Sequence, residues 1–304
     1  MNTALKGNPL EFFVKIWGTR GSIPTPGYAT QRYGGNTTCV AIQIGDQLII
    51  CDAGTGIREL GLDIMKRNAG PVNGHWLFSH THWDHIQGFP FFTPAYIPGN
   101  TFTVYGLNQG DQKAYSILSG QMSSAYFPVK FCDLASNIVS NDLETCKGMF
   151  GDVKVSWFSQ HHEGGSYAYS FEYNGLKFVF STDNEVDLGF EDPEEIQGNL
   201  NKMRPVEPAY LDFIRDADLL IADGQYTEEE YPTKITWGHP RATTLVDASI
   251  QANVKKLAIT HHDPMHTDRA VDEKIAACTD RLKRFRGDTQ VFAAREGLEL
   301  KLEP

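Results

Sequence analysis

The sequence is poor in cysteine and contains no long apolar run. The cysteines form no Cys-x-x-Cys pair and their number, five, is odd; they are Cys39, Cys51, Cys132, Cys146 and Cys278. This pattern points neither to a disulfide framework nor to a thiolate zinc site, but to buried thiols in a reducing compartment. No stretch approaches about 18 consecutive apolar residues, and residues 1–6 lack the apolar core of a signal peptide. We therefore expect a soluble, cytoplasmic protein without a membrane segment.

Basic residues are in the minority as well. The chain has 27 Lys and Arg against 38 Asp and Glu, a formal net charge of −11. Such an excess of negative charge repels polyanions, so a long nucleic acid is disfavoured as the substrate. A small anion stays allowed, because bound divalent cations would reverse the sign locally. With 304 residues, 41% of them hydrophobic, the chain can bury a large core, and we expect a single domain over residues 1–304.

Histidine, in contrast, is concentrated in one short stretch. Three imidazoles and one carboxylate fall within six residues, His80 to His85, directly after the apolar run 76–78. His80 and His82 point the same way from an extended backbone and can chelate one ion, whereas Asp84 and His85 lie on the turn that follows and can address a second ion. Nitrogen and oxygen ligands without thiolate suit Zn²⁺, Mn²⁺ or Fe²⁺. Incidental histidines in a polar loop are disfavoured, because the whole chain has only ten.

Apolar and alternating runs outline the secondary structure around this stretch. Strands are predicted at 12–17, 38–44, 47–51, 153–158, 170–173, 177–180, 219–222, 256–259 and, closing the chain, 290–293; helices are predicted at 57–66, 115–122, 208–216, 241–252 and 268–285. The dipeptides Gly45-Asp46 and Asn174-Gly175 predict tight hairpin turns. The segment from about 88 to 150 is rich in aromatic residues, Pro and Gly. It is either an insertion that forms a pocket wall, or a supply of aromatic side chains to the core.

Further histidines and aspartates follow predicted strands. His161 and His162 come after strand 153–158, Asp183 after 177–180, and His261 after 256–259. A carboxylate at such a strand end can bridge two cations with its two oxygens. The alternative for Asp183 is a helix cap or an Asx turn. A binuclear site needs ligands from several such segments, so we expect these strand ends to converge.

The His80–His85 motif, with these strand-end residues in this order, resembles the metallo-β-lactamase superfamily. Within it the chain is most similar to the phosphodiesterase branch that includes tRNase Z and the cyclic phosphodiesterases of phosphonate breakdown. The resemblance implies an α/β fold, a four-layer αββα sandwich with two mixed sheets. It also implies a ligand set, in which Asp183 bridges two ions: His80, His82 and His162 on the first, and Asp84, His85 and His261 on the second. A family pattern of His, one residue and two Gly favours His162 as the ligand, in which case His161 would face away; His161 is the alternative ligand.

The same resemblance suggests roles for other residues. His239 stands where the branch has a Gly-His-Ser/Thr segment, whose His stabilises the leaving group or the phosphate. Here Pro240 and Arg241 replace the usual hydroxyl residue, and a His at a helix N-terminus is the structural alternative. Asp52 resembles a buried aspartate that braces the His loop without touching metal. The remaining candidates have less defined roles: Arg20, Asn36 and Thr37 as scaffold or substrate contacts, His262 and Asp263 as groups that orient ligands, and Asp223 as a pocket residue.

These inferences predict a binuclear metal-dependent hydrolase with two divalent ions, Zn²⁺ in the first place and Mn²⁺ or Fe²⁺ as alternatives. The expected reaction is hydrolysis of small anionic phosphodiesters, such as 3',5'-cyclic nucleotides, by a metal-bridging hydroxide. Asp84 and Asp183 would fix the metals and accept the water's proton, and His239 would donate to or steady the departing oxygen as general acid. The alternatives are a lactone, thioester or β-lactam hydrolase, a tRNA 3'-processing endonuclease, a non-hydrolytic binding module and a di-iron redox protein. The natural substrate and the oligomeric state, a homodimer included, stay open.

Overall fold

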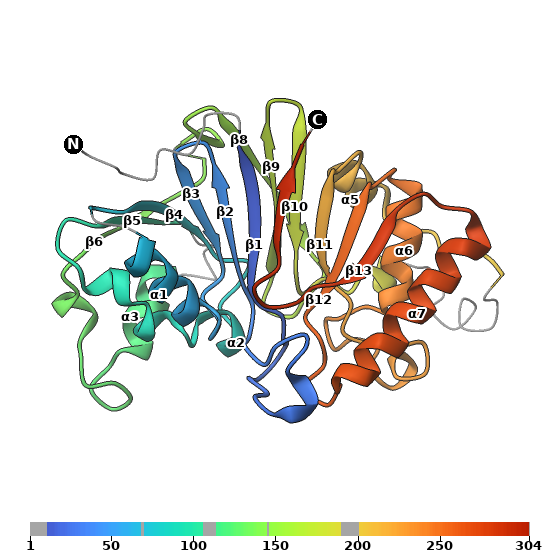
Figure 1. Ribbon diagram of the computed structural model, residues 1–304, viewed down its shortest axis with the longest axis horizontal. Helices are drawn as coiled ribbons and strands as arrows, with labels where there is room; N and C mark the ends of the chain where they lie inside the picture. The colour runs from blue at the N-terminus through green and yellow to red at the C-terminus, as the bar shows by residue number, and fades with distance from the viewer. Residues whose placement is uncertain (1–10, 68–69, 106–113, 145, 190–200, 304) are drawn as a thin grey trace.

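Two seven-stranded sheets face each other in the computed structural model, and the helices cover their outer faces (Figure 1). The structure describes residues 11–67, 70–105, 114–144, 146–189 and 201–303. Helices α1, α2 and α3 accompany the first sheet, and α5, α6 and α7 accompany the second. Each sheet contains both parallel and antiparallel neighbours. This is the αββα sandwich with two mixed sheets that the sequence predicts.

The first sheet has the strand order β14-β1-β2-β3-β4-β5-β6. Its strands are β1 (Phe12–Gly18), β2 (Cys39–Ile44), β3 (Gln47–Cys51), β4 (Asn73–Leu77), β5 (Thr101–Tyr105), β6 (Asn137–Asn141) and β14 (Glu299–Leu302). Strands β3 to β6 pair in parallel, whereas β14, β1, β2 and β3 pair antiparallel. The helices on this side are α1 (Ile57–Arg67), α2 (Trp83–Ile86) and α3 (Ala114–Gln121).

The second sheet has the order β13-β12-β11-β10-β9-β8-β7. Its strands are β7 (Met149–Phe150), β8 (Val153–Gln160), β9 (Ser166–Tyr173), β10 (Leu176–Ser181), β11 (Leu219–Asp223), β12 (Lys256–Thr260) and β13 (Gln290–Ala293). Strands β10 to β13 are parallel, and their crossovers carry α5 (Pro208–Ile214), α6 (Ala242–Gln251) and α7 (Asp268–Phe285). Parallel strands covered on both faces need continuous apolar runs, and β11 is accordingly buried at every residue.

Local sequence signals account for several turns and ends. The hairpin between β9 and β10 turns on Asn174 and Gly175, whose φ angles of 49° and 79° suit the right-handed twist of the strands. Thr267 caps α7, since its side chain accepts a hydrogen bond from the amide of Ala270. The hairpin is the one that the sequence predicts from Asn174-Gly175, whereas the Thr267 cap was not predicted.

The inner faces of the two sheets share one apolar core. Phe12 and Ile42 of the first sheet belong to the same buried cluster as Phe171 and Phe178 of the second. Burying each such side chain stabilises the fold by about 1.5–3 kcal/mol. The core thereby holds the ends of strands from both sheets in a fixed relation, on which the candidate site depends.

The structure corrects the predicted end of the chain and adds strands that the sequence analysis did not predict. Strand 290–293 does not close the fold, because β14 follows it and pairs antiparallel with β1 on the first sheet. Strands β5 and β6 lie within the aromatic-rich segment 88–150, of which residues 106–113 and 145 are outside the described residues. Phe89, Phe92 and Phe102 of this segment are buried in the core under α1. A core role is thus found for these three side chains, and a pocket wall stays a prediction.

No helix among the described residues combines the length and the apolar composition that crossing a bilayer requires. The expected single domain and the cytoplasmic location stay predictions.

Candidate metal centre

Loops that follow strands of both sheets meet at one edge of the sandwich, the lower edge in Figure 1, beside α2. The chain after β4 supplies His80 and His82 from a loop and Asp84 and His85 from α2. The loops after β8, β10 and β12 supply His162, Asp183 and His261. The carboxyl ends of parallel strands lie at the same edge of a sheet, which is why residues distant in sequence gather there. His80 and His82 lie on the loop beyond β4, three and five residues after its last residue, Leu77, and not within the strand itself.

His80, His82 and His162 form a cluster of converging imidazoles. Their ligand nitrogens all lie within 4.8 Å of one another. The Nε2 atom of His162 is 3.1 Å from Nδ1 of His82. The Nε2 atoms of His80 and of His162 are each 3.7 Å from Oδ2 of Asp183. These distances leave room for one cation between the three rings.

Asp84, His85 and His261 form the adjoining cluster. The Nε2 atoms of His85 and of His261 are each 3.2 Å from Oδ2 of Asp84. The same two nitrogens are each 3.3 Å from Oδ1 of Asp183. Asp183 therefore turns one oxygen to each cluster, the arrangement that a carboxylate bridging two cations would have.

The chemistry of these donors fits divalent metal ions. The Nε2 atoms of His80 and His85 are buried, and neither has a hydrogen-bond partner among the described residues. A buried polar atom without a partner costs free energy, so such atoms are rare in folded proteins. Both nitrogens point toward carboxylates at distances too long, or in directions too poor, for a hydrogen bond. A cation between them would satisfy both.

The electrostatics of the site favour positive charge. Burial alone would raise the pKa of Asp183, but His261, His85 and His80 together lower it well below its usual value. Burial alone would lower the pKa of His261, but the negative charges of Asp183 and its neighbours raise it to about 9. The pKa of His85 is raised well above its usual value for the same reason. Without metal, protons thus take up part of the positive charge that this site attracts.

Asp52 orients His85 and the loop that carries it. Nδ1 of His85 lies 2.8 Å from Oδ2 of Asp52. The amide and the hydroxyl of Ser79 also donate to this carboxylate, at 2.7 and 2.8 Å. A proton on Nδ1 that is shared with Asp52 leaves Nε2 of His85 free to face the centre. This geometry agrees with the bracing role that the resemblance implies for Asp52.

Two further contacts at the second cluster were not anticipated from the sequence. Nδ1 of His261 donates to Oε1 of Gln225 at 2.9 Å, and the amide of Ser22 donates to Oδ2 of Asp84 at 2.7 Å. Gly21 passes so close to His261 that a Cβ there would lie 2.3 Å from its ring. A backbone amide and a distant Gln side chain carry no motif, so only the folded structure identifies them.

Three of the central residues have left-handed backbone conformations. The φ angles are 61° for Asp52, 55° for Asp183 and 55° for His261, and each residue follows the last residue of a strand within two positions. Residues other than Gly adopt this conformation at a cost, and such residues cluster at functional sites. The sharp turn after each strand directs these side chains along the edge of the sheet and into the centre.

The side chains of the adjacent residues His161 and His162 point in different directions. His161 has a half-exposed side chain whose Nε2 is 3.1 Å from Glu207. His162 is nearly buried and faces His82 and Asp183. Of the two, the structure brings only His162 to the centre.

His239 and Asp223 lie at the centre as a pair. Nδ1 of His239 is 2.7 Å from Oδ2 of Asp223 and 3.9 Å from Oδ2 of Asp183. Its ring stacks on that of His261 with centroids 4.9 Å apart. Asp223 had no assigned chemistry in the sequence analysis, and the structure gives it a defined partner.

The remaining candidates contact the protein scaffold. Arg20 is buried and donates to the carbonyls of Gly34 and His266. The other contacts are Asn36 Nδ2 to Glu296, Thr55 amide to Thr37 Oγ1, and His262 Nε2 to the carbonyl of Ala294. Asp263 accepts a hydrogen bond from Gln225, the residue that holds His261.

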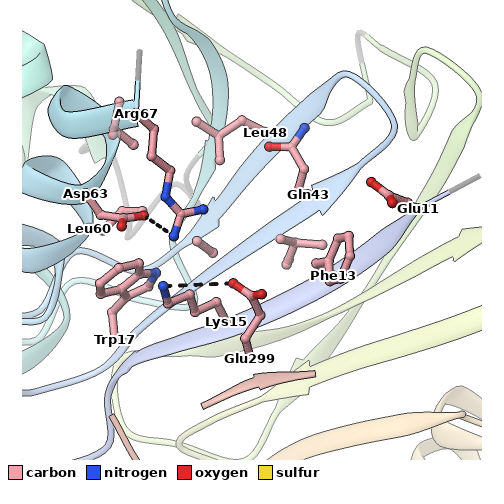
Figure 2. Close-up of a pocket in the computed structure, with 13 residues that line it drawn as sticks. Glu11, Phe13, Lys15, Trp17, Gln43, Leu48, Leu60, Asp63, Arg67 and Glu299 are labelled. Carbon is pink, nitrogen blue, oxygen red and sulfur yellow. Dashed lines mark ion pairs between the residues drawn. The ribbon is translucent and has the colours of Figure 1, made fainter. Parts of the chain in front are cut away.

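A separate cavity of about 300 Å³ lies on the outer face of the first sheet beside α1. Figure 2 shows its mixed lining, in which Lys15 pairs with Glu299 and Arg67 with Asp63 around the Trp17 ring. None of the centre's residues is among the described residues that line it. This cavity therefore plays no part in the proposed chemistry.

Comparisons with known proteins agree with this fold. The model of the beta-lactamase superfamily domain matches residues 48–262. Ribonuclease Z of Methanosarcina mazei is 24% identical over 286 residues, which cover 83% of this chain and 87% of that protein. Among solved structures, the metallo-beta-lactamase fold protein YhfI from Bacillus subtilis has a TM-score of 0.64 at 14% identity and covers 96% of this chain and 99% of its own. Human tRNase Z, short form, has a TM-score of 0.62 at 15% identity, covering 96% and 100%.

Proposed function

Because this chain belongs to the beta-lactamase superfamily and is a metal-dependent hydrolase, we propose that it cleaves phosphodiester bonds at a centre of two divalent metal ions. The observation that carries this proposal is the position of the His239 ring, whose Nδ1 lies 2.7 Å from Asp223 and 3.9 Å from Oδ2 of Asp183, the aspartate shared by both ligand clusters. A proton donor in that position suits the departure of an alkoxide from phosphorus.

The proposed ligands are those that the structure brings together. His80, His82 and His162 hold the first ion, Asp84, His85 and His261 hold the second, and Asp183 is shared. Imidazole nitrogens outnumber carboxylates and no thiolate takes part, which favours Zn²⁺ over Mg²⁺ or Ca²⁺ and leaves Mn²⁺ and Fe²⁺ as alternatives. When bound, two such ions activate a water molecule and neutralise charge on the phosphoryl group.

His239 serves as the general acid in this proposal. Its Nδ1 is engaged by Asp223 at 2.7 Å, a contact that fixes the orientation of the ring. Nε2 is then the nitrogen that donates a proton to the leaving oxygen. Asp84 accepts a hydrogen bond from the amide of Ser22 at 2.7 Å. That contact fixes one carboxylate oxygen beside His261, and we propose that Asp84 accepts the proton of the attacking water.

Two substrate classes are candidates, and we place RNA first. The similarity to proteins named ribonuclease Z extends over most of both chains, which favours a phosphodiester bond in RNA. The net charge of −11 favours a small diester such as a 3',5'-cyclic nucleotide. That charge is a sum over the whole molecule, however, whereas the field at the site is set by the ions and the nearby side chains. The acidic composition therefore does not exclude RNA.

A substrate panel tests the proposal. The metal-loaded protein is assayed side by side with bis(p-nitrophenyl) phosphate, cyclic AMP, cyclic GMP, an RNA with a 3' extension, and a lactone. We expect metal-dependent cleavage of the model diester and of at least one nucleotide, with the RNA turned over at the highest kcat/KM. Turnover of the lactone alone would contradict a phosphodiesterase and favour the carbonyl hydrolase alternative.

A further inference from the structure

Glu185 is a buried carboxylate two residues beyond Asp183. Its side chain accepts three hydrogen bonds from one short segment of the chain: Oε1 from the hydroxyl of Tyr231 at 2.7 Å and the amide of Thr236 at 2.8 Å, and Oε2 from the amide of Gly238 at 2.7 Å. The residue is fully buried. Placing a carboxylate in such a position costs free energy unless it is fully hydrogen-bonded, as it is here.

The segment that Glu185 holds makes direct contact with the centre. Nδ1 of His162 lies 3.1 Å from the carbonyl oxygen of Gly238. A carbonyl only accepts, so Nδ1 carries the proton and donates it, which leaves Nε2 unprotonated and facing His82 and Asp183. Gly238 has a φ of 87°, and a Cβ at this position would lie 2.1 Å from Nδ1 of His162. A side chain at position 238 would therefore clash with the imidazole of His162.

We propose that Glu185 is a positioning residue for the first ion: its carboxylate fixes the 236–238 turn so that the Gly238 carbonyl sets the tautomer and the orientation of His162. The inference rests on the proposed role of His162 as a metal ligand. The loop after β10 would then supply the shared Asp183 and, through Glu185, would also orient His162, the ligand that follows β8. Buried partners that orient a metal-binding histidine change the metal affinity although they do not touch the ion.

Replacement by glutamine separates this role from simple packing. Glu185→Gln keeps the size of the side chain but puts an NH₂ group where one carboxylate oxygen accepts. That group would face either the amide of Gly238, or the amide of Thr236 together with the hydroxyl of Tyr231, donor against donor. Tyr231→Phe is the matched control, because it removes one hydrogen bond to the same carboxylate and leaves the bonds from Thr236 and Gly238 in place.

The test measures zinc affinity by chelator competition for the wild type, Glu185→Gln, Tyr231→Phe, His162→Ala and the double variant Glu185→Gln/His162→Ala. We expect Glu185→Gln to weaken zinc binding by about 10- to 100-fold, and Tyr231→Phe to keep the wild-type affinity. In the His162→Ala background, Glu185→Gln should cause no further loss, because its effect passes through His162. The visible spectrum of the cobalt-substituted protein should change in Glu185→Gln and stay unchanged in Tyr231→Phe.

The outcomes are distinguishable. Weaker binding in His162→Ala with unchanged binding in Glu185→Gln would overturn the role of Glu185 alone. The role of Glu185 would also be overturned if Glu185→Gln lowered the zinc affinity equally in the wild-type and His162→Ala backgrounds. Unchanged binding in His162→Ala would overturn the ligand assignment itself. One test uses the wild-type protein and so does not depend on the folding of any variant. NMR of the zinc-loaded protein should show the His162 proton on Nδ1. A proton on Nε2 would contradict the inference.

Discussion

The carboxylate of Asp52 lies 2.8 Å from Nδ1 of His85 and takes two more hydrogen bonds from Ser79. All three groups are buried. Asp52→Asn would keep the size of the side chain but replace one acceptor oxygen by a donor that faces another donor. We expect this variant to fold and to bind metal about 10- to 100-fold more weakly, measured by chelator competition. Asp46→Asn, in the exposed turn between β2 and β3, is the control and should bind as the wild type does.

The neighbouring residues His161 and His162 offer a second test with an internal control. His162→Ala should lower the bound metal to about one ion per chain, because one cluster loses a ligand. His161→Ala should leave the metal content unchanged, because that ring faces Glu207 and solvent. The measurement is metal analysis of each protein after dialysis. The reverse order of losses would show that the two histidines have been assigned the wrong way round.

His239→Ala should separate chemistry from metal binding. The proposed general acid is lost while the ligand set stays complete, so kcat should fall by about 10² to 10⁴ and the metal content should not change. Asp223→Asn should also lower kcat, but by less than His239→Ala does, because the imidazole of His239 remains and loses only its charged partner. The check is steady-state kinetics on bis(p-nitrophenyl) phosphate with metal analysis of the same samples. A variant as fast as the wild type would remove His239 from the mechanism.

Metal binding should release protons. In the metal-free protein the pKa of His261 is raised to about 9, so this ring is protonated at neutral pH, and a metal ion has to displace that proton. Calorimetric titrations with Zn²⁺ at pH 7, in buffers with different ionisation enthalpies, should therefore show net proton release. The release should shrink as the pH rises past about 9. Binding without proton release would contradict the protonated state of the metal-free site.

The raised pKa of His261 also predicts how the stability of the metal-free protein depends on pH. A histidine whose pKa is about 6.5 in the unfolded chain and about 9 in the folded protein stabilises the folded state most below pH 6.5. This contribution is lost as the pH rises through 9. Thermal unfolding of the metal-free protein should show that loss, and His261→Ala should remove this part of the pH dependence.

Much of the fold could be predicted from the sequence, because the signals were local. Continuous apolar runs identified β11 and β12, Asn174-Gly175 identified a hairpin, and the predicted helix 268–285 coincides with α7. Strand β14 was not predicted, since Glu299–Leu302 has only two apolar residues and becomes a strand through pairing with β1, almost the whole chain away. Tertiary pairing of this kind overrides weak local preference.

In the candidate site, too, the residues with a local sequence pattern could be predicted, whereas those defined by tertiary contacts could not. The ligands His80, His82, Asp84 and His85 could be predicted from their close spacing. Asp183 and His261 could be predicted because each follows an apolar strand. Glu185 and Gln225, which position the ligands, belong to no recognisable sequence motif. Their roles depend on contacts between segments far apart in sequence. A Glu in a polar loop is ordinarily a solvated side chain, and only its burial against the 236–238 turn reveals another role.

A crystal structure of the zinc-loaded protein, with anomalous diffraction data collected at the zinc edge, tests the binuclear centre directly. Two anomalous peaks about 3.5–4 Å apart should appear, one among His80, His82 and His162, the other among Asp84, His85 and His261, with Asp183 between them. A single peak elsewhere, or none within ligand distance of Asp183, would contradict the binuclear centre and the phosphodiesterase proposal that depends on it.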